Sequence, residues 1–145
     1  MTLDNLVGRT LDKIEPDPAA IKRLLQAARR NIADSNIKEL SDESRFDIAY
    51  KAIMQLANAA LQANGYRTRT SVPGHHQTMI QSLVKTIGLP GSEMTVLDAL
   101  RKQRNVADYS GDTVPESAVR ECVTRAESLM DKVSKWLADN RPGYS

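Results

Sequence analysis

The residues most suited to chemistry lie in the segment RKQRNVADYSGD, positions 101–112. On a helix, Arg104 falls within about 20° of Leu97 and therefore points with the apolar face. A guanidinium held against an apolar surface needs a partner, and Asp108, about one turn further on, supplies a carboxylate. Two interpretations stay open. The Arg104–Asp108 pair is structural and fixes this helix to its neighbours, or Arg104 lies at the edge of a cleft and recognises phosphate.

Both histidines of the chain are adjacent, in the sequence Gly74-His75-His76. A helix is predicted to begin here, and the positive end of its dipole disfavours the charged imidazolium. A histidine that is neutral near pH 7 can accept a proton. Adjacent helical residues point about 100° apart, so the two rings cannot chelate one ion, and we expect no metal site. Capping or packing of the loop is the alternative role.

Helices are predicted to position these residues. Apolar residues recur at three- and four-residue intervals in five segments, and no segment shows convincing two-residue alternation. The predicted helices begin after the cap Asp17, at Ser41, at about His75, after the turn LPGS and at Pro115; the second, third and fourth end at Gly65, Gly88 and Gly111. The expected fold is all-α, an antiparallel up-and-down bundle of about five helices.

The chain of 145 residues fits one domain. We expect residues 1–14 to form an N-terminal arm or short helix, residues 15–140 the bundle, and residues 141–145 a disordered tail. The single cysteine, Cys122, excludes an internal disulfide and falls on the apolar face of the last helix. No apolar run approaches the length of a membrane span or resembles a signal peptide, so we expect a cytoplasmic protein with no membrane contact.

The uncharged, alanine-rich segment AIMQLANAALQANG forms the second half of the second predicted helix. Small side chains let a neighbouring helix approach closely. The segment is therefore predicted to be either a central core helix, which we favour, or the seam of a dimer.

The net charge of +2 is unevenly distributed. Positions 48–92 hold no carboxylate but contain Lys51, Arg67, Arg69 and Lys85. If Arg67 and Arg69 share one end of the bundle with Arg101 and Arg104, they form a local positive patch suited to an anion. The six aromatic residues are too few and too dispersed for a base-stacking platform, so any RNA contact is expected to depend on phosphates and shape. GxGxxG, Walker, HExxH and GxSxG motifs are absent, and no cofactor is predicted.

The order of these features resembles the HEPN superfamily (higher eukaryotes and prokaryotes nucleotide-binding domain). An alanine-rich helix ending in GY is followed by an arginine-containing loop, GHH, RNxxDY and a long amphipathic helix, over roughly Asp17 to Ala138. The resemblance implies a helical bundle, usually a homodimer. Many members are metal-independent ribonucleases, often toxins paired with a nucleotidyltransferase-type antitoxin. Others are non-catalytic and bind nucleotides or proteins.

The resemblance also implies site residues. Arg104 and Asn105 match the arginine and polar positions of the family's catalytic motif, whereas Asp108 and Tyr109 stand where its histidine is expected. Our hypothesis is that Arg104 binds the scissile phosphate of RNA, His75 or His76 moves a proton from the ribose 2′-OH, and Tyr109 orients either. The predicted phosphate-binding residues are Arg67, Arg69, Arg101, Arg104 and Asn105. The alternative function is a non-catalytic module that binds an antitoxin or nucleotidyltransferase-type partner.

Overall fold

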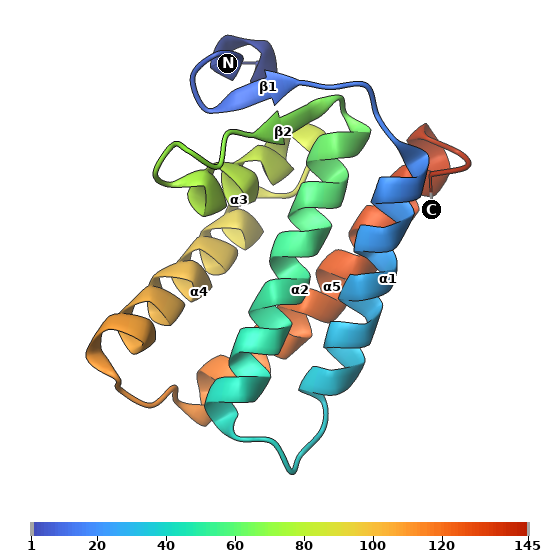
Figure 1. Cartoon of the computed structure of the whole chain (residues 1–145). Coiled ribbons are helices and arrows are strands. Elements are labelled where there is room, and N and C mark those ends of the chain that lie inside the picture. Colours follow the sequence, from blue (N-terminus) through green and yellow to red (C-terminus); the bar gives the residue numbers. More distant parts are fainter. Residues whose placement is uncertain (1, 145) are drawn as a thin grey trace.

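The computed structural model describes residues 2–144, and helices dominate this part of the chain (Figure 1). Its elements are the 3-10 helix η1 (Leu3–Leu6), β1 (Leu11–Lys13), α1 (Pro18–Ser35), α2 (Asp42–Ala63), β2 (Tyr66–Thr68), α3 (His75–Thr86), α4 (Gly91–Ser110) and α5 (Glu116–Asn140). The four long helices alternate in direction along the chain, and the shorter α3 links α2 to α4. The predicted all-α bundle of about five helices is confirmed.

The helix termini follow the capping residues that the sequence offers. The side chain of Asp17 accepts a hydrogen bond from the Ala19 amide at 3.0 Å, directly before α1. Ser41 does the same for the Ser44 amide at 3.2 Å, directly before α2. Directly after the C-terminal end of α4, Gly111 has a φ of 71°, a left-handed conformation in which a side chain would be strained. These predicted boundaries are confirmed.

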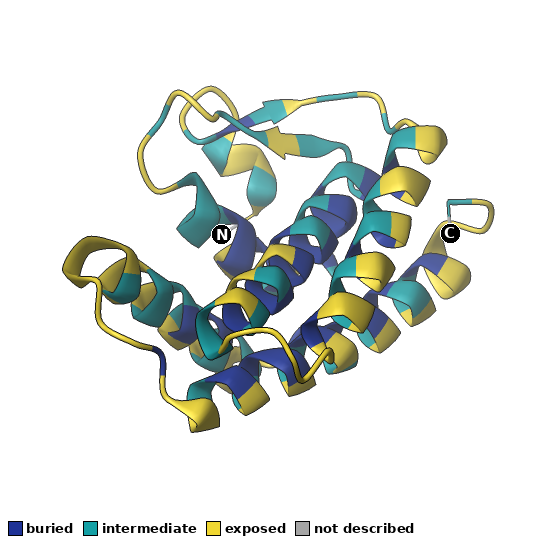
Figure 2. Cartoon of the chain, turned by 60° about the horizontal axis from the view of Figure 1, so that its bottom comes forward, coloured by how far each residue is buried: buried dark blue, intermediate teal, exposed yellow. Residues whose placement is uncertain are grey.

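The alanine-rich half of α2 lies in the centre of the core. Ala57, Ala59 and Ala60 are fully buried, and Figure 2 shows buried positions along most of this helix. The chain's own helices α1, α3 and α5 pack around α2. The core interpretation of this segment is therefore confirmed, and the dimer-seam alternative is wrong for it, because its small side chains are already covered.

A pair of short strands was not predicted. β1 and β2 pair antiparallel, with Leu11 opposite Thr68 and Lys13 opposite Tyr66. The N-terminal segment thus contains the expected short helix, η1, and also a strand. Three residues on each side are too few to show alternation, and the two strands lie far apart in the sequence, so no local pattern indicates them.

Further contacts hold the N-terminal segment on the bundle. The Tyr66 hydroxyl donates to Asp4, and the Arg69 guanidinium donates to the Gly8 carbonyl at 2.6 Å. At the other end of the chain, the Arg141 guanidinium donates to the Ala63 carbonyl at 3.3 Å. The domain limits at 14 and 140 stay predictions, and Ser145 of the predicted tail lies outside the described residues. None of the helices in residues 2–144 is both long and apolar enough to span a bilayer.

The burial of α2 leads to a stability prediction. Ala60→Leu adds three heavy atoms to a fully packed position, so we expect the free energy of unfolding to fall by about 1–3 kcal/mol. Lys51→Ala, at an exposed position of the same helix, is the matched control and should change it by less than about 0.5 kcal/mol. Urea denaturation measures both. Equal effects of the two changes would contradict the central placement of α2.

Candidate functional site

The predicted chemistry lies where the start of α3 faces the second half of α4. A hollow of about 530 Å³ opens there, and seven residues singled out from the sequence line it: His75, His76, Arg101, Arg104, Asn105, Asp108 and Tyr109. We call it the α4 hollow. A second hollow of about 460 Å³ adjoins it and has α2 as its floor; we call it the α2 hollow. Among the described residues that line them, only His76 and Arg104 belong to both.

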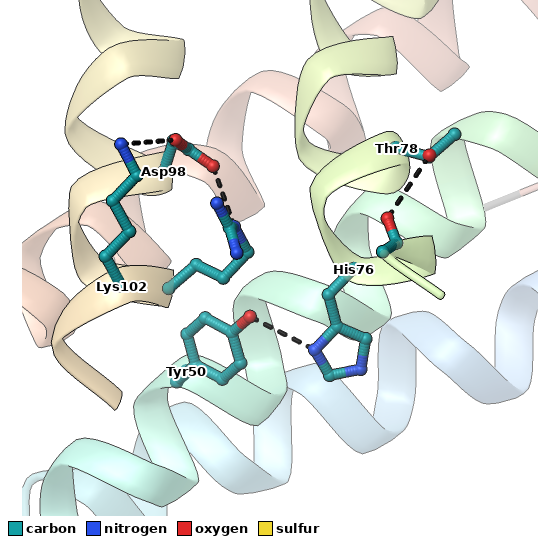
Figure 3. Close-up of polar contacts among 7 residues, drawn as sticks. Tyr50, His76, Thr78, Asp98 and Lys102 are labelled. Carbon is teal, nitrogen blue, oxygen red and sulfur yellow. Dashed lines mark hydrogen bonds and ion pairs between the residues drawn. The ribbon is translucent and has the colours of Figure 1, made fainter. Parts of the chain in front are cut away.

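Tyr50 of α2 holds His76 at the border of the two hollows. The Tyr50 hydroxyl and His76 Nδ1 are 3.2 Å apart, as Figure 3 shows. Tyr50 is only 2% exposed, and this burial raises its pKa to about 12, so it keeps its proton. Burial also lowers the pKa of His76, with smaller contributions from His75, Arg104 and Arg101. The neutral histidine expected from the sequence is thus favoured here mainly by burial.

The Tyr50–His76 hydrogen bond controls which chemistry His76 can perform. If His76 Nδ1–H donates to the Tyr50 oxygen, Nε2 keeps a lone pair and can accept a proton. If Tyr50 donates to Nδ1 instead, Nε2–H is a hydrogen-bond donor that suits an anionic oxygen. Either arrangement gives a neutral imidazole with one nitrogen left for a ligand.

Arg104 lies over the face of the Tyr50 ring, with Cζ 5.1 Å from the ring centroid. Its Nε is 3.8 Å from Asp47 Oδ1, and its NH1 is 3.9 Å from Asp108 Oδ2. The predicted Arg104–Asp108 pair therefore forms, but the arginine is 33% exposed and both carboxylates are about half exposed. Pairs this long and this open to water are weak. The guanidinium keeps hydrogen-bonding capacity for a ligand.

The other predicted phosphate-binding arginines differ in their surroundings. Arg101 lines the α4 hollow, but its Nε donates to Asp98 Oδ1 at 2.8 Å, and Lys102 lies 3.5 Å from the other oxygen (Figure 3). The hydrogen bond from Arg101 lowers the pKa of Asp98, so this carboxylate stays charged. Arg101 is thus engaged in an ion pair beside the site.

Arg67 and Arg69 are not brought to either hollow. Arg67 lies in β2 opposite Asp12 of β1, and Arg69 follows this strand, with its Nε 3.6 Å from Asp12 Oδ1. Arg69 also donates a hydrogen bond to the Gly8 carbonyl. These two contacts tie the N-terminal segment to the residues that follow β2. The patch that we expected from Arg67, Arg69, Arg101 and Arg104 is therefore not assembled as predicted. Of these four, Arg101 and Arg104 line a hollow and the other two do not.

Three residues of α2 were missed by sequence reasoning. Asp47, Tyr50 and Lys51 line the α2 hollow and lie at helical spacing on one face. The available signal was two charges and a hydroxyl within a mostly apolar helix. It could not be used from the sequence alone, because the burial of Tyr50 depends on how α3 and α4 pack against α2.

Other reactive groups stand apart from this site. Cys122 is buried, and burial raises the pKa of its thiol to about 12, so it is not a poised nucleophile. Within residues 2–144 there is no cluster of three or more His, Cys, Asp or Glu side chains suited to a metal ion.

In comparisons with known proteins, no family model matches the chain and no curated protein gives a significant match.

The lowered pKa of His76 predicts how stability depends on pH. As pH falls below about 6.5, the ordinary pKa, the unfolded chain binds a proton that folded His76 resists, so stability decreases. His76→Gln removes this linkage and should lose less stability between pH 7.5 and 5.5, as measured by urea denaturation. Tyr50→Phe should retain most of the pH dependence, because burial is the main cause. The same slope in His76→Gln and wild type would contradict the assignment.

The exposure of Arg104 predicts its effect on stability. Arg104→Ala should lower the free energy of unfolding by about 1 kcal/mol, because it removes two weak ion pairs and a cation–π contact. A buried pair would instead cost about 3–5 kcal/mol when one partner is removed. Thermal or urea denaturation separates the two values. The larger loss would show that the arginine is mainly structural.

Proposed function

We propose that the two adjoining hollows form a site that binds a phosphate group of RNA or of a nucleotide, with Arg104 as its main cationic ligand. The single observation that supports this most is the placement of Arg104. It is a partly exposed guanidinium, weakly paired, on the wall shared by both hollows and beside a histidine whose pKa is lowered. A planar guanidinium suits pairs of phosphate oxygens.

The start of α3 adds to this anion preference. Gly74 precedes the helix with a φ of 83°, and no side chain caps the first turn. The first turn of α3 lines the α4 hollow, so the positive end of the helix dipole lies beside it and favours an anion there. Gly74 also lets the chain turn sharply before α3, where His75 and His76 line the α4 hollow.

A metal-independent ribonuclease is the catalytic form of this proposal. His76 Nε2 would take the proton from a ribose 2′-OH, and Arg104 would stabilise the charge that develops on the adjacent phosphate. The order of sequence motifs supports a HEPN-like domain and a homodimer, as in the resemblance described above. A toxin role with an antitoxin partner belongs to the same proposal.

A non-catalytic interaction module is the second candidate, and one observation favours it. Val106 and Tyr109 are 54% and 91% exposed near the end of α4. The two residues lie three positions apart on one helix, so together they expose a small apolar area that a partner protein could cover. The partner would be an antitoxin or a nucleotidyltransferase-type protein.

RNA binding provides the decisive test of the proposed function. Arg104→Gln should weaken binding of a fluorescent single-stranded RNA by about ten-fold or more, since hydrogen bonds to charged groups contribute about 1.5–3 kcal/mol. The slope of log affinity against log salt should also fall by about 0.7 for the lost phosphate contact. Fluorescence anisotropy across a salt series measures both quantities.

Arg120→Gln is the matched control for this experiment. It removes the same charge from an exposed arginine of α5 that pairs with Glu116 and lines neither hollow. Unchanged binding by Arg104→Gln, or equal weakening by both changes, would refute the site.

Incubation of RNA in EDTA with wild type, Arg104→Gln and His76→Ala tests cleavage. Salt-insensitive co-purification of a partner protein, without RNA binding, would favour the interaction module.

A further inference from the structure

The two hollows meet at the residues proposed to hold phosphate. The α4 hollow is lined by the start of α3 and the second half of α4, and the α2 hollow mainly by one face of α2. His76 and Arg104 form the wall between them. A phosphate held by Arg104 therefore has a space on each side, and each space is in the size range of small-ligand sites.

The α4 hollow offers a surface for a flat ring. Tyr109 lines it and is 91% exposed, so the faces of its ring are open. Bases stack on such rings with little sequence preference. Asn105 also lines the α4 hollow and supplies an amide for hydrogen bonding. One aromatic residue is not a stacking platform, but it is enough for a single base.

The α2 hollow has a different lining. Met54 and Met79 give it an apolar surface, and Gln55 and Asn58 place amides beside it. The carbonyl oxygens of these amides already accept hydrogen bonds, Gln55 from Asn31 at 2.8 Å and Asn58 from Gln62 at 3.0 Å. Their NH2 groups can therefore donate hydrogen bonds to a ligand, and the acceptor atoms of a nucleobase suit such donors.

We propose that this site binds an internal phosphodiester of single-stranded RNA, with one nucleoside in each hollow, in preference to a mononucleotide. The proposal depends on the proposed function, because it needs the phosphate at Arg104. A mononucleotide fills one hollow and leaves the other empty. Two nucleosides that point to opposite sides of one phosphate require unstacked, unpaired bases, which single strands provide and duplexes do not.

The charge of the two probes makes the test sharp. Isothermal titration calorimetry compares uridine 5′-monophosphate with the dinucleoside monophosphate UpU, methylated at the 2′-oxygens so that it cannot be cleaved. UpU carries less negative charge, so electrostatic attraction alone favours the mononucleotide. We expect UpU to bind about ten-fold more tightly, because a stacked base alone adds about 1–3 kcal/mol.

Changes on each side of the wall test each hollow separately. Tyr109→Ala removes the stacking ring, and Asn58→Phe fills the α2 hollow; each should weaken UpU binding about five-fold or more. Tyr109→Phe keeps the stacking ring and should weaken UpU binding less than Tyr109→Ala does. Ile37→Ala, at an exposed apolar residue that lines neither hollow, is the matched control. If Asn58→Phe does not fold, Lys51→Trp fills the same hollow from an exposed position.

The outcomes separate this inference from the function on which it depends. If Arg104→Gln weakens both probes but UpU binds no more tightly than the mononucleotide, the two-hollow arrangement is refuted and the phosphate site remains. An effect at only one of Tyr109 and Asn58 also refutes it. If Arg104→Gln changes neither affinity, the proposed function fails and this inference fails with it.

Discussion

The burial of α2 is the constraint on which the other features depend. Its alanine-rich half allows α1, α3 and α5 to pack closely around one helix, and this packing gives the domain its core. One face of α2 lines the α2 hollow, and it carries Asp47, Tyr50 and Lys51. That face is the floor of the site. The same helix therefore supplies the stability of the bundle and the surface against which Arg104 and His76 are placed.

Tyr50 is the link between core and site. It is almost completely buried, yet it makes a hydrogen bond to His76 and lies under the guanidinium of Arg104. Residues from α3 and α4 are thus oriented by one ring of α2. Because the ring is buried, its position is set by packing in the core rather than by solvent.

The carboxylates near Arg104 affect anion binding. Asp47 and Asp108 pair only weakly with the guanidinium, and each would also repel a phosphate that approaches it. Burial raises the pKa of Asp47 above its ordinary value. This repulsion is consistent with a selective site on a nearly neutral protein, where a ligand has to supply contacts beyond charge.

The helices, their caps and the central place of the alanine-rich segment can be predicted from the amino-acid sequence, because they depend on local periodicity and on single residues such as Asp17, Ser41 and Gly111. The sequence also located seven residues that share one hollow. The other features become known only when the packed chain is seen. These features arise from contacts between residues distant along the chain: the pairing of β1 with β2, the hydrogen bond of Arg69 to Gly8, and the contacts of Tyr50 with His76 and Arg104. Burial and hydrogen-bond partners are properties of the packed molecule, so no local pattern encodes them.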